Sequence, residues 1–268
     1  MMYAYIHIAL NVKSPFLADK LTRQALAHLV DVDKMIQTVK YGQAEKVIGP
    51  VHPSKKKDYN TSIVPYNYNL DEAKALLEKA GWRNTNGDET LDKMIEGKRT
   101  EFAFDFIVNA ESDERKSIAL LFQAEAKKIG IKVNVLPIDW AVFLERCKNH
   151  KFDLSIVLWV GGPTPDDYKQ NYHSASATGE GSNYYNFSNA EADSLIIAIR
   201  SEIEEEKRSE MYKRLQEIFH EEVPMIYLWA PTERIAISKK FDNAYPSTMR
   251  PGYWAPGFKM KTAVSSSQ

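Results

Sequence analysis

Apolar and polar positions along the chain repeat with the periods of strands and helices. Three and four-residue spacing of apolar side chains predicts helices in seven segments: 16–30, 32–40, 69–80, 112–129, 139–148, 189–202 and 206–222. Dense or alternating apolar residues predict strands at 3–10, 101–108, 131–136, 153–159 and 223–229, with a further candidate strand at 233–238. Between residues 101 and 159 the order is strand, helix, strand, helix, strand. That order predicts parallel pairing and an α/β fold.

Segments rich in Gly, Pro and polar residues separate these elements. Residues 42–65 and 160–188 are predicted as long surface loops, and 84–99 as a turn or short hairpin. Towards the end of the chain, 241–260 is predicted to be irregular and 264–268 to be a polar tail.

Composition and charge exclude several classes of protein. The 268 residues carry 35 basic and 36 acidic side chains, a net charge of -1, which argues against a nucleic-acid partner. The single cysteine cannot form an intrachain disulfide, which fits either a reducing compartment or an exported protein without disulfides. No apolar run is long enough to cross a membrane. The first residues also lack the pattern of a signal peptide, so a fragment cut at a domain boundary is expected.

The segment 152–162 is the first candidate for a binding site. An apolar, β-branched strand ends at Trp159 and opens into a loop, 161–168, that contains Asp166 and Asp167. Ligands of α/β folds lie beyond the carboxyl ends of strands, so an aromatic ring with carboxylates there is suited to hold a small molecule. The alternative is an ordinary strand-to-loop connection, in which the Trp is buried and the two carboxylates are solvated.

Other residues with reactive or polar groups have a structural interpretation as well as a functional one. Tyr184, Tyr185 and Phe187 belong either to a pocket or to the core. Cys147 is a conceivable thiolate nucleophile or a plain helix cysteine. The six histidines share no metal-ligand spacing, so neither a metal site nor a cofactor is expected.

Six motifs in order along the chain resemble family 5 of the bacterial extracellular solute-binding proteins, which includes dipeptide-, oligopeptide- and nickel-binding proteins of ABC transporters. The motifs are Leu10-Asn11 with Pro15-Phe16 and Arg23-Gln24-Ala25-Leu26, Asp31 to Ile36, Ala73 to Leu77 with Ala80-Gly81, Ile129 to Val133, Phe152-Asp153 to Trp159, and Arg208 to Pro224.

The resemblance implies a periplasmic-binding-protein-like (type II) α/β lobe with a mixed, mainly parallel sheet flanked by helices. Members of the family are two-lobed clamps, and this chain resembles the second lobe (1–225) and a C-terminal segment (226–268) that returns toward a missing N-terminal lobe. The implied partners are a peptide or other small solute and an ABC permease. The implied location is periplasmic or extracellular, with a membrane tether in the full-length protein.

The resemblance also implies the ligand-binding residues. Trp140 matches a tryptophan that lines a side-chain pocket, and Trp159, Val160 and Gly161 match a strand end that pairs with an extended peptide. Asn183 lies where the family often has a polar contact with the ligand, while Tyr185 is a candidate from its residue type alone.

One departure from the family pattern concerns charge. Gly162 stands where peptide-binding members have an Asp that pairs with the ligand's ammonium group, which leaves Asp166 or Asp167 as replacements. In addition, Leu158 replaces a small Gly and crowds the site.

The expected function is therefore capture of a peptide-like solute and its delivery to a membrane permease, without catalysis. Two alternatives remain at this point: a solute-sensing regulatory module of the same fold, and a cysteine hydrolase that uses Cys147.

Overall fold

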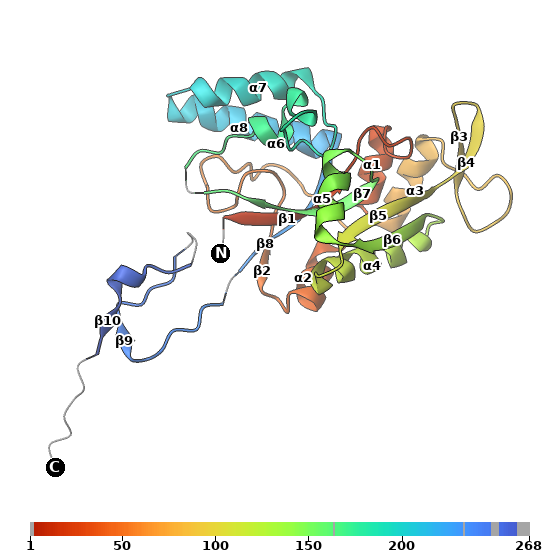
Figure 1. Cartoon of the computed structure of the whole chain (residues 1–268). Helices are drawn as coiled ribbons and strands as arrows, with labels where there is room; N and C mark the ends of the chain where they lie inside the picture. Colours follow the sequence, from red (N-terminus) through yellow and green to blue (C-terminus); the bar gives the residue numbers. More distant parts are fainter. Residues whose placement is uncertain (1–2, 163, 233, 248–251, 262–268) are drawn as a thin grey trace, which may run out of the picture.

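The computed structural model describes residues 3–162, 164–232, 234–247 and 252–261. Its centre is a six-stranded sheet with the order β2-β8-β1-β7-β5-β6 (Figure 1). The strands of this sheet are β1 (Ala4–Leu10), β2 (Ala44–Lys46), β5 (Ala103–Asn109), β6 (Lys132–Ile138), β7 (Leu154–Val160) and β8 (Met225–Pro231). Strands β5, β6, β7 and β8 run in one direction, while β1 and β2 run in the other. The predicted α/β fold with a mixed, mainly parallel sheet is confirmed.

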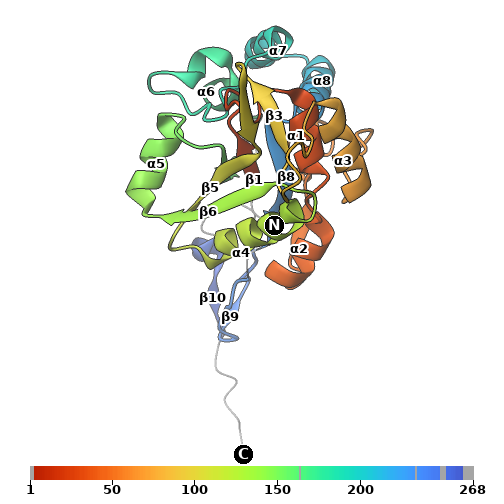
Figure 2. The same cartoon turned by 90° about the vertical axis from the view of Figure 1, so that its right-hand side faces the viewer.

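Helices cover both faces of this sheet, as Figure 2 shows for α5 and α6 on one side and α1 to α3 on the other. The helices are α1 (Lys20–Ala27), α2 (Val32–Val39), α3 (Leu70–Lys79), α4 (Asp113–Lys127), α5 (Trp140–Lys148), α6 (Lys169–Tyr172), α7 (Ala190–Ser201) and α8 (Glu205–Glu222). Among the described residues no helix is both long and apolar enough to cross a membrane.

The two faces of the sheet have different cores because successive side chains of a strand point to opposite faces. On β1, Ile6, Ile8 and Leu10 join the core beneath α1 to α4, whose fully buried aromatic residues are Phe and Trp. Tyr5 and His7 point to the other face, where tyrosines from α6, α8 and the loops around them gather. The second core is thus aromatic and carries hydroxyl groups.

Smaller elements lie outside the main sheet. A hairpin of β3 (Asp92–Ile95) and β4 (Lys98–Glu101) fills part of the segment predicted as a turn or hairpin. The last described residues form β9 (Phe241–Asp242), a 3-10 turn η2 (Ala255–Gly257) and β10 (Lys259–Met260), and they project away from the sheet (Figure 1).

Several predicted boundaries were wrong. The first helix begins at Lys20 rather than 16, because the Asp19 side chain accepts the Leu21 N–H and caps it there. Strand β2 lies inside the predicted loop 42–65, where pairing with β8 holds a polar segment extended. The loop 160–188 contains α6 and a 3-10 turn, η1 (Ser174–Ala177). Residues 234–238 form no strand, and the predicted tail at 264–268 lies outside the described residues.

Candidate functional site

The carboxyl ends of β5, β6 and β7 lie at one edge of the sheet. These strands are parallel and end at Asn109, Ile138 and Val160. Strand β1 begins at the same edge, where Ala4 faces Val160, and β8 ends there. The edge therefore brings together the predicted residues that follow β6 and β7, namely Trp140 and the segment 159–162.

Strand β7 extends beyond its neighbour β5. The two strands pair at Phe106 with Leu154 and at Ile107 with Ser155, and β5 then ends at Asn109. On the other side, β7 stays paired with β1 as far as Val160. In the part of the chain that the structure describes, residues 158–160 thus have a strand on one side only.

The backbone groups of this segment have two orientations. The Gly161 N–H donates to the Tyr3 carbonyl at 2.7 Å, which places it on the β1 side. Because the N–H and C=O groups of successive strand residues point to opposite sides, those of Val160 and Leu158 face away from β1. Their side chains are 47% and 37% exposed, so an extended segment of another molecule can reach this edge.

Trp159 forms the aromatic surface beside this edge. Its indole stacks on the Tyr5 ring with centroids 5.1 Å apart and an interplanar angle of 19°. It also lies across Gly161, where an added Cβ would come within 1.8 Å of the indole. Only glycine fits at position 161 while Trp159 holds this orientation.

Trp140 lies at the start of α5, directly after β6. The Asp139 side chain caps this helix by accepting the Ala141 N–H at 2.8 Å. The Trp140 ring stacks on Phe143 at 5.4 Å and remains 41% exposed. The guanidinium of Arg115 lies over the same ring, 5.8 Å from the centroid. Trp140 is therefore a fixed and accessible aromatic side chain at the same edge of the sheet.

Asp166 is not free to bind an ammonium group of a ligand. Its carboxylate is 2.7 Å from the Lys55 ammonium, and both side chains are almost fully buried. The Tyr168 hydroxyl donates to the same carboxylate at 3.0 Å. Burial raises the pKa of Asp166 above its usual value, while the Lys55 charge opposes that shift. A lysine of this chain thus occupies the place that a ligand's amine would need.

Asp167 also has a partner within the chain. Its side chain lies 3.1 Å from the Arg200 guanidinium and accepts the Lys169 N–H at 3.0 Å. Gly162 has no side chain, so neither it nor the two replacement acids offers an unpaired carboxylate.

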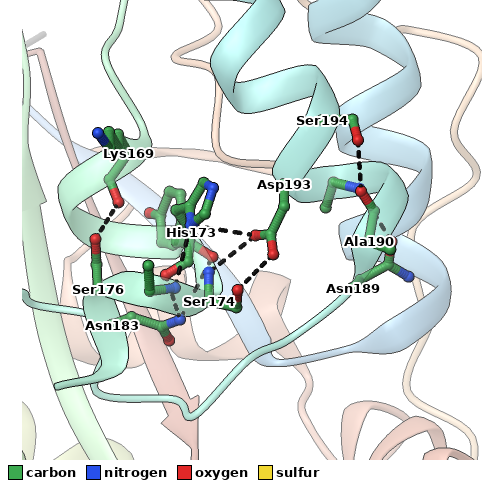
Figure 3. A network of polar contacts seen from close by, with 12 residues as sticks. Lys169, His173, Ser174, Ser176, Asn183, Asn189, Ala190, Asp193 and Ser194 are labelled. Atoms are coloured by element: carbon green, nitrogen blue, oxygen red, sulfur yellow. Dashed lines mark hydrogen bonds and ion pairs between the residues drawn. The ribbon is translucent and has the colours of Figure 1, made fainter.

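Asn183 and Tyr185 point into the protein rather than toward the edge. Figure 3 shows Asn183 turned toward the segment around His173. Its amide donates to the carbonyls of Tyr172, His173 and Phe187 and accepts the Phe187 N–H. Its hydrogen-bonding groups therefore hold the loop together, and the expected contact with a ligand has no support here.

Tyr185 closes part of the aromatic core instead. It is 3% exposed, and its hydroxyl lies 2.7 Å from Nε2 of His7. Of the two alternatives for this tyrosine, core and pocket, its burial favours the core.

The features of a catalytic cysteine are absent from Cys147. The side chain is fully buried, and burial raises the pKa of its thiol to about 12. A thiolate nucleophile requires the opposite shift. The described residues also contain no cluster of His, Cys, Asp and Glu that could hold a metal ion.

Sequence reasoning missed Lys55 and Arg115. Lys55 lies in the segment 42–65, which is predicted as a surface loop, and nothing local marks its pairing with Asp166. Arg115 lies in the first turn of a helix, where a charged side chain is unremarkable in sequence. Only the fold brings the first beside the loop after β7 and the second beside Trp140.

Comparisons with known proteins agree on one family. Residues 2–182 match the model described as "Bacterial extracellular solute-binding proteins, family 5 Middle". The chain is 31% identical over 243 residues to the oligopeptide-binding protein AppA of Bacillus subtilis, covering 90% of this chain and 44% of AppA. It is 32% identical over 222 residues to heme-binding protein A of Haemophilus influenzae, covering 82% of this chain and 38% of that protein.

A solved structure supports the same relationship. The structure of Bacillus subtilis AppA in complex with a nonapeptide superposes with a TM-score of 0.86 at 29% identity, covering 98% of this chain and 51% of that one. The chain thus spans about half the length of the relatives that it matches.

Proposed function

This chain belongs to family 5 of the bacterial extracellular solute-binding proteins, and we propose that it is one lobe of a two-lobed protein that captures a peptide-like solute for an ABC permease. The proposed protein acts by hinge closure around its solute and catalyses no reaction. Its proposed location is periplasmic or extracellular, with a tether to the membrane.

The observation that carries this proposal is the open side of β7 at residues 158–160. An extended peptide could align there and form main-chain hydrogen bonds with Leu158 and Val160, as in strand addition. Such bonds give affinity without regard to side chains, while Trp140 and Trp159 supply apolar contact. AppA, a relative of this chain, was solved in complex with a nonapeptide.

The path of the chain supports the two-lobed arrangement. Strands β1 and β8 are neighbours in the sheet. Strand β1 begins, and β8 ends, at the same edge. Beyond β8 the chain projects outward, and Tyr245 and Trp254 are each 71% exposed (Figure 1). A second lobe at this edge would cover such aromatic residues. The division into a second lobe, 1–225, and a returning segment, 226–268, stays a proposal, and β8 continues in the sheet to Pro231.

The main test removes one backbone donor from the open side of β7. Because the Val160 N–H faces away from β1, Val160→Pro deletes this donor without breaking the β1–β7 ladder. We expect calorimetric titration of the intact protein with an unmodified nonapeptide to show roughly tenfold weaker binding, the value of about one hydrogen bond to a well-ordered site. Val64→Pro is the matched control, since Val64 is 81% exposed and lies outside the sheet.

Two results would count against the proposal. Binding of the peptide with unchanged affinity in Val160→Pro would exclude strand addition at β7. Equal dissociation constants for the 268-residue chain alone and for a two-lobed protein that contains it would exclude a clamp, because a single lobe leaves one side of the ligand in water.

A further inference from the structure

Three different groups surround the ammonium of Lys55. Its Nζ is 2.7 Å from the Asp166 carboxylate and donates a hydrogen bond to the Thr164 carbonyl at 2.7 Å. The ring of Tyr3 lies on a further side, with its centroid 6.0 Å from Nζ. An ammonium group has three N–H donors, and a carboxylate, a carbonyl and an aromatic face each attract it. These groups, which we call the ammonium cage, have the composition of a binding site for an amine.

Burial distinguishes this ion pair from the others in the described part of the chain. The side chain of Lys55 is 9% exposed and that of Asp166 is 4% exposed. In each of the other pairs at least one side chain is more exposed than either of these, as in Arg23 with Glu222. Taking a lysine out of water is unfavourable unless its charge is paired and hydrogen-bonded, and the neighbouring Lys56 stays exposed. The fold therefore buries one lysine of a run and satisfies its charge internally.

The ammonium cage lies beside the binding edge. The loop that follows β7 supplies its carboxylate and its carbonyl. Tyr3 belongs to the edge as well, because its carbonyl accepts the Gly161 N–H at 2.7 Å. Tyr168, which donates to the carboxylate, has its ring 6.4 Å from that of Trp159. An amine of a solute at the end of β7 would therefore lie close to this cage, which Lys55 already occupies.

We propose that Lys55 takes the place of a solute's ammonium group and thereby determines the specificity of the site. The inference rests on the proposed function and specifies the substrate class: peptide-like solutes whose amino terminus contributes nothing to binding. The stem of Lys55 fills the cage, and its charge neutralises the carboxylate that would attract an amine. The other acid of this loop, Asp167, is paired with Arg200 and offers no replacement. Peptides with free and with blocked amino termini are thus equivalent for this protein.

The first test compares one nonapeptide with a free and with an acetylated amino terminus, in calorimetric titrations of the intact protein. For the unmodified protein we expect dissociation constants that differ by less than about twofold, since the amine meets no unpaired carboxylate of this loop. A larger preference for the free peptide would overturn the proposal, because the amine would then be recognised in spite of Lys55. This comparison requires no variant.

A variant connects the specificity to Lys55. Lys55→Ala removes the internal ammonium and leaves space for another, so the free nonapeptide should bind roughly tenfold more tightly than the acetylated one. Lys56→Ala is the matched control, because Lys56 is an exposed neighbour in the same loop, and it should keep the two peptides equivalent. If Lys55→Ala binds both peptides equally well, Lys55 merely anchors the loop and the proposal is wrong.

A measurement without a peptide keeps the two proposals separate. If neither peptide binds the unmodified protein, the proposed function fails, and n-propylammonium then serves as the probe, since it matches the part of the side chain that Lys55→Ala removes. It should raise the unfolding temperature of Lys55→Ala in a saturable manner and leave that of the unmodified protein unchanged. No increase, or an equal increase with 1-propanol, would show that the cage does not select an ammonium group and would overturn the proposal.

Discussion

The two halves of β7 consist of similar residues but have different surroundings. In the inner half, Leu154, Ser155 and Ile156 are fully buried, with β1 on one side and β5 on the other. In the outer half, Leu158 and Val160 are substantially exposed, and only β1 is paired. The inner half therefore stabilises the sheet, whereas the outer half is available to a ligand.

The difference arises from the neighbouring strand. Strand β5 ends at Asn109, whose side chain accepts the Glu111 N–H and turns the chain toward α4. Ser112 then caps that helix through the Arg115 N–H. The open side of β7 thus results from the early end of β5, although Leu158 and Val160 themselves belong to β7.

The largest expected effect comes from breaking the ion pair between Lys55 and Asp166, which anchors the loop that follows β7. Lys55→Met leaves the buried Asp166 carboxylate unpaired, which should lower the free energy of unfolding by about 3–5 kcal/mol at pH 7. Burial already raises the pKa of Asp166, and the loss of the Lys55 charge raises it further, so the carboxyl takes up a proton more readily and the deficit should shrink as the pH falls. Urea unfolding at several pH values measures both effects.

The neighbouring residue provides a control for that change. Lys56→Met alters an exposed lysine of the same loop and should cost less than about 0.5 kcal/mol. An equal loss in both variants would show that the Lys55–Asp166 pair does not anchor the loop.

A direct comparison of the two halves uses the same type of truncation in each. Ile156→Ala removes a fully buried side chain and should cost about 2–5 kcal/mol, with little effect on ligand contacts. Leu158→Ala removes a side chain that is 37% exposed and should cost about 1 kcal/mol or less. Denaturant titration of both variants tests the comparison, and similar losses would mean that the outer half is as well packed as the inner half.

Two adjacent glycines test the position of Trp159. Gly161→Ala places a Cβ within 1.8 Å of the indole and should displace it, at a cost of about 1–3 kcal/mol. Gly162→Ala meets no atom closer than 3.9 Å and should leave Trp159 in place. Tryptophan fluorescence and peptide affinity should change in the first variant only; identical spectra for the two would contradict the packing described.

The last prediction is a pH dependence and concerns His7, which faces Val157 at the junction of the two halves. Burial, with a contribution from the Arg115 charge, lowers its pKa from 6.5 to about 3. The unfolded chain therefore binds more protons between these values, and stability should fall by up to about 1.4 kcal/mol for each pH unit below 6.5. Unfolding experiments at pH 4 to 7 should show a shallower slope for His7→Gln than for the unmodified protein or His28→Gln.

Much of the fold could be predicted because apolar spacing is a local property. The strands and helices between 101 and 159 were placed within a few residues, since each has a clear period and a capping residue such as Ser112. Strand β2 could not be predicted in this way. Its three residues, Ala44–Lys46, become a strand through pairing with β8, which lies far along the chain.

The site was less predictable, because it depends on which side chains the fold brings together. The position of Trp140 and Trp159 at the carboxyl edge could be predicted, since both lie at or just after the end of a strand, and their contact with a ligand stays a prediction. Asp166 and Asn183 looked equally suitable in sequence, yet the fold pairs the first with Lys55 and uses the second to hold a loop. Contacts between residues that are far apart in the chain leave no signal in the local sequence.

The place of β1 in the sheet also affects how the protein is made. Within this lobe β1 is synthesised before the other five strands of the sheet, and its two neighbours, β7 and β8, are the last two of them. At typical rates of synthesis, residues 4–10 would wait about 10–45 s before residue 227 is available. During that time an almost wholly apolar segment remains without its partners. Production of this lobe should therefore be sensitive to chaperones that shield nascent chains and to the speed of translation.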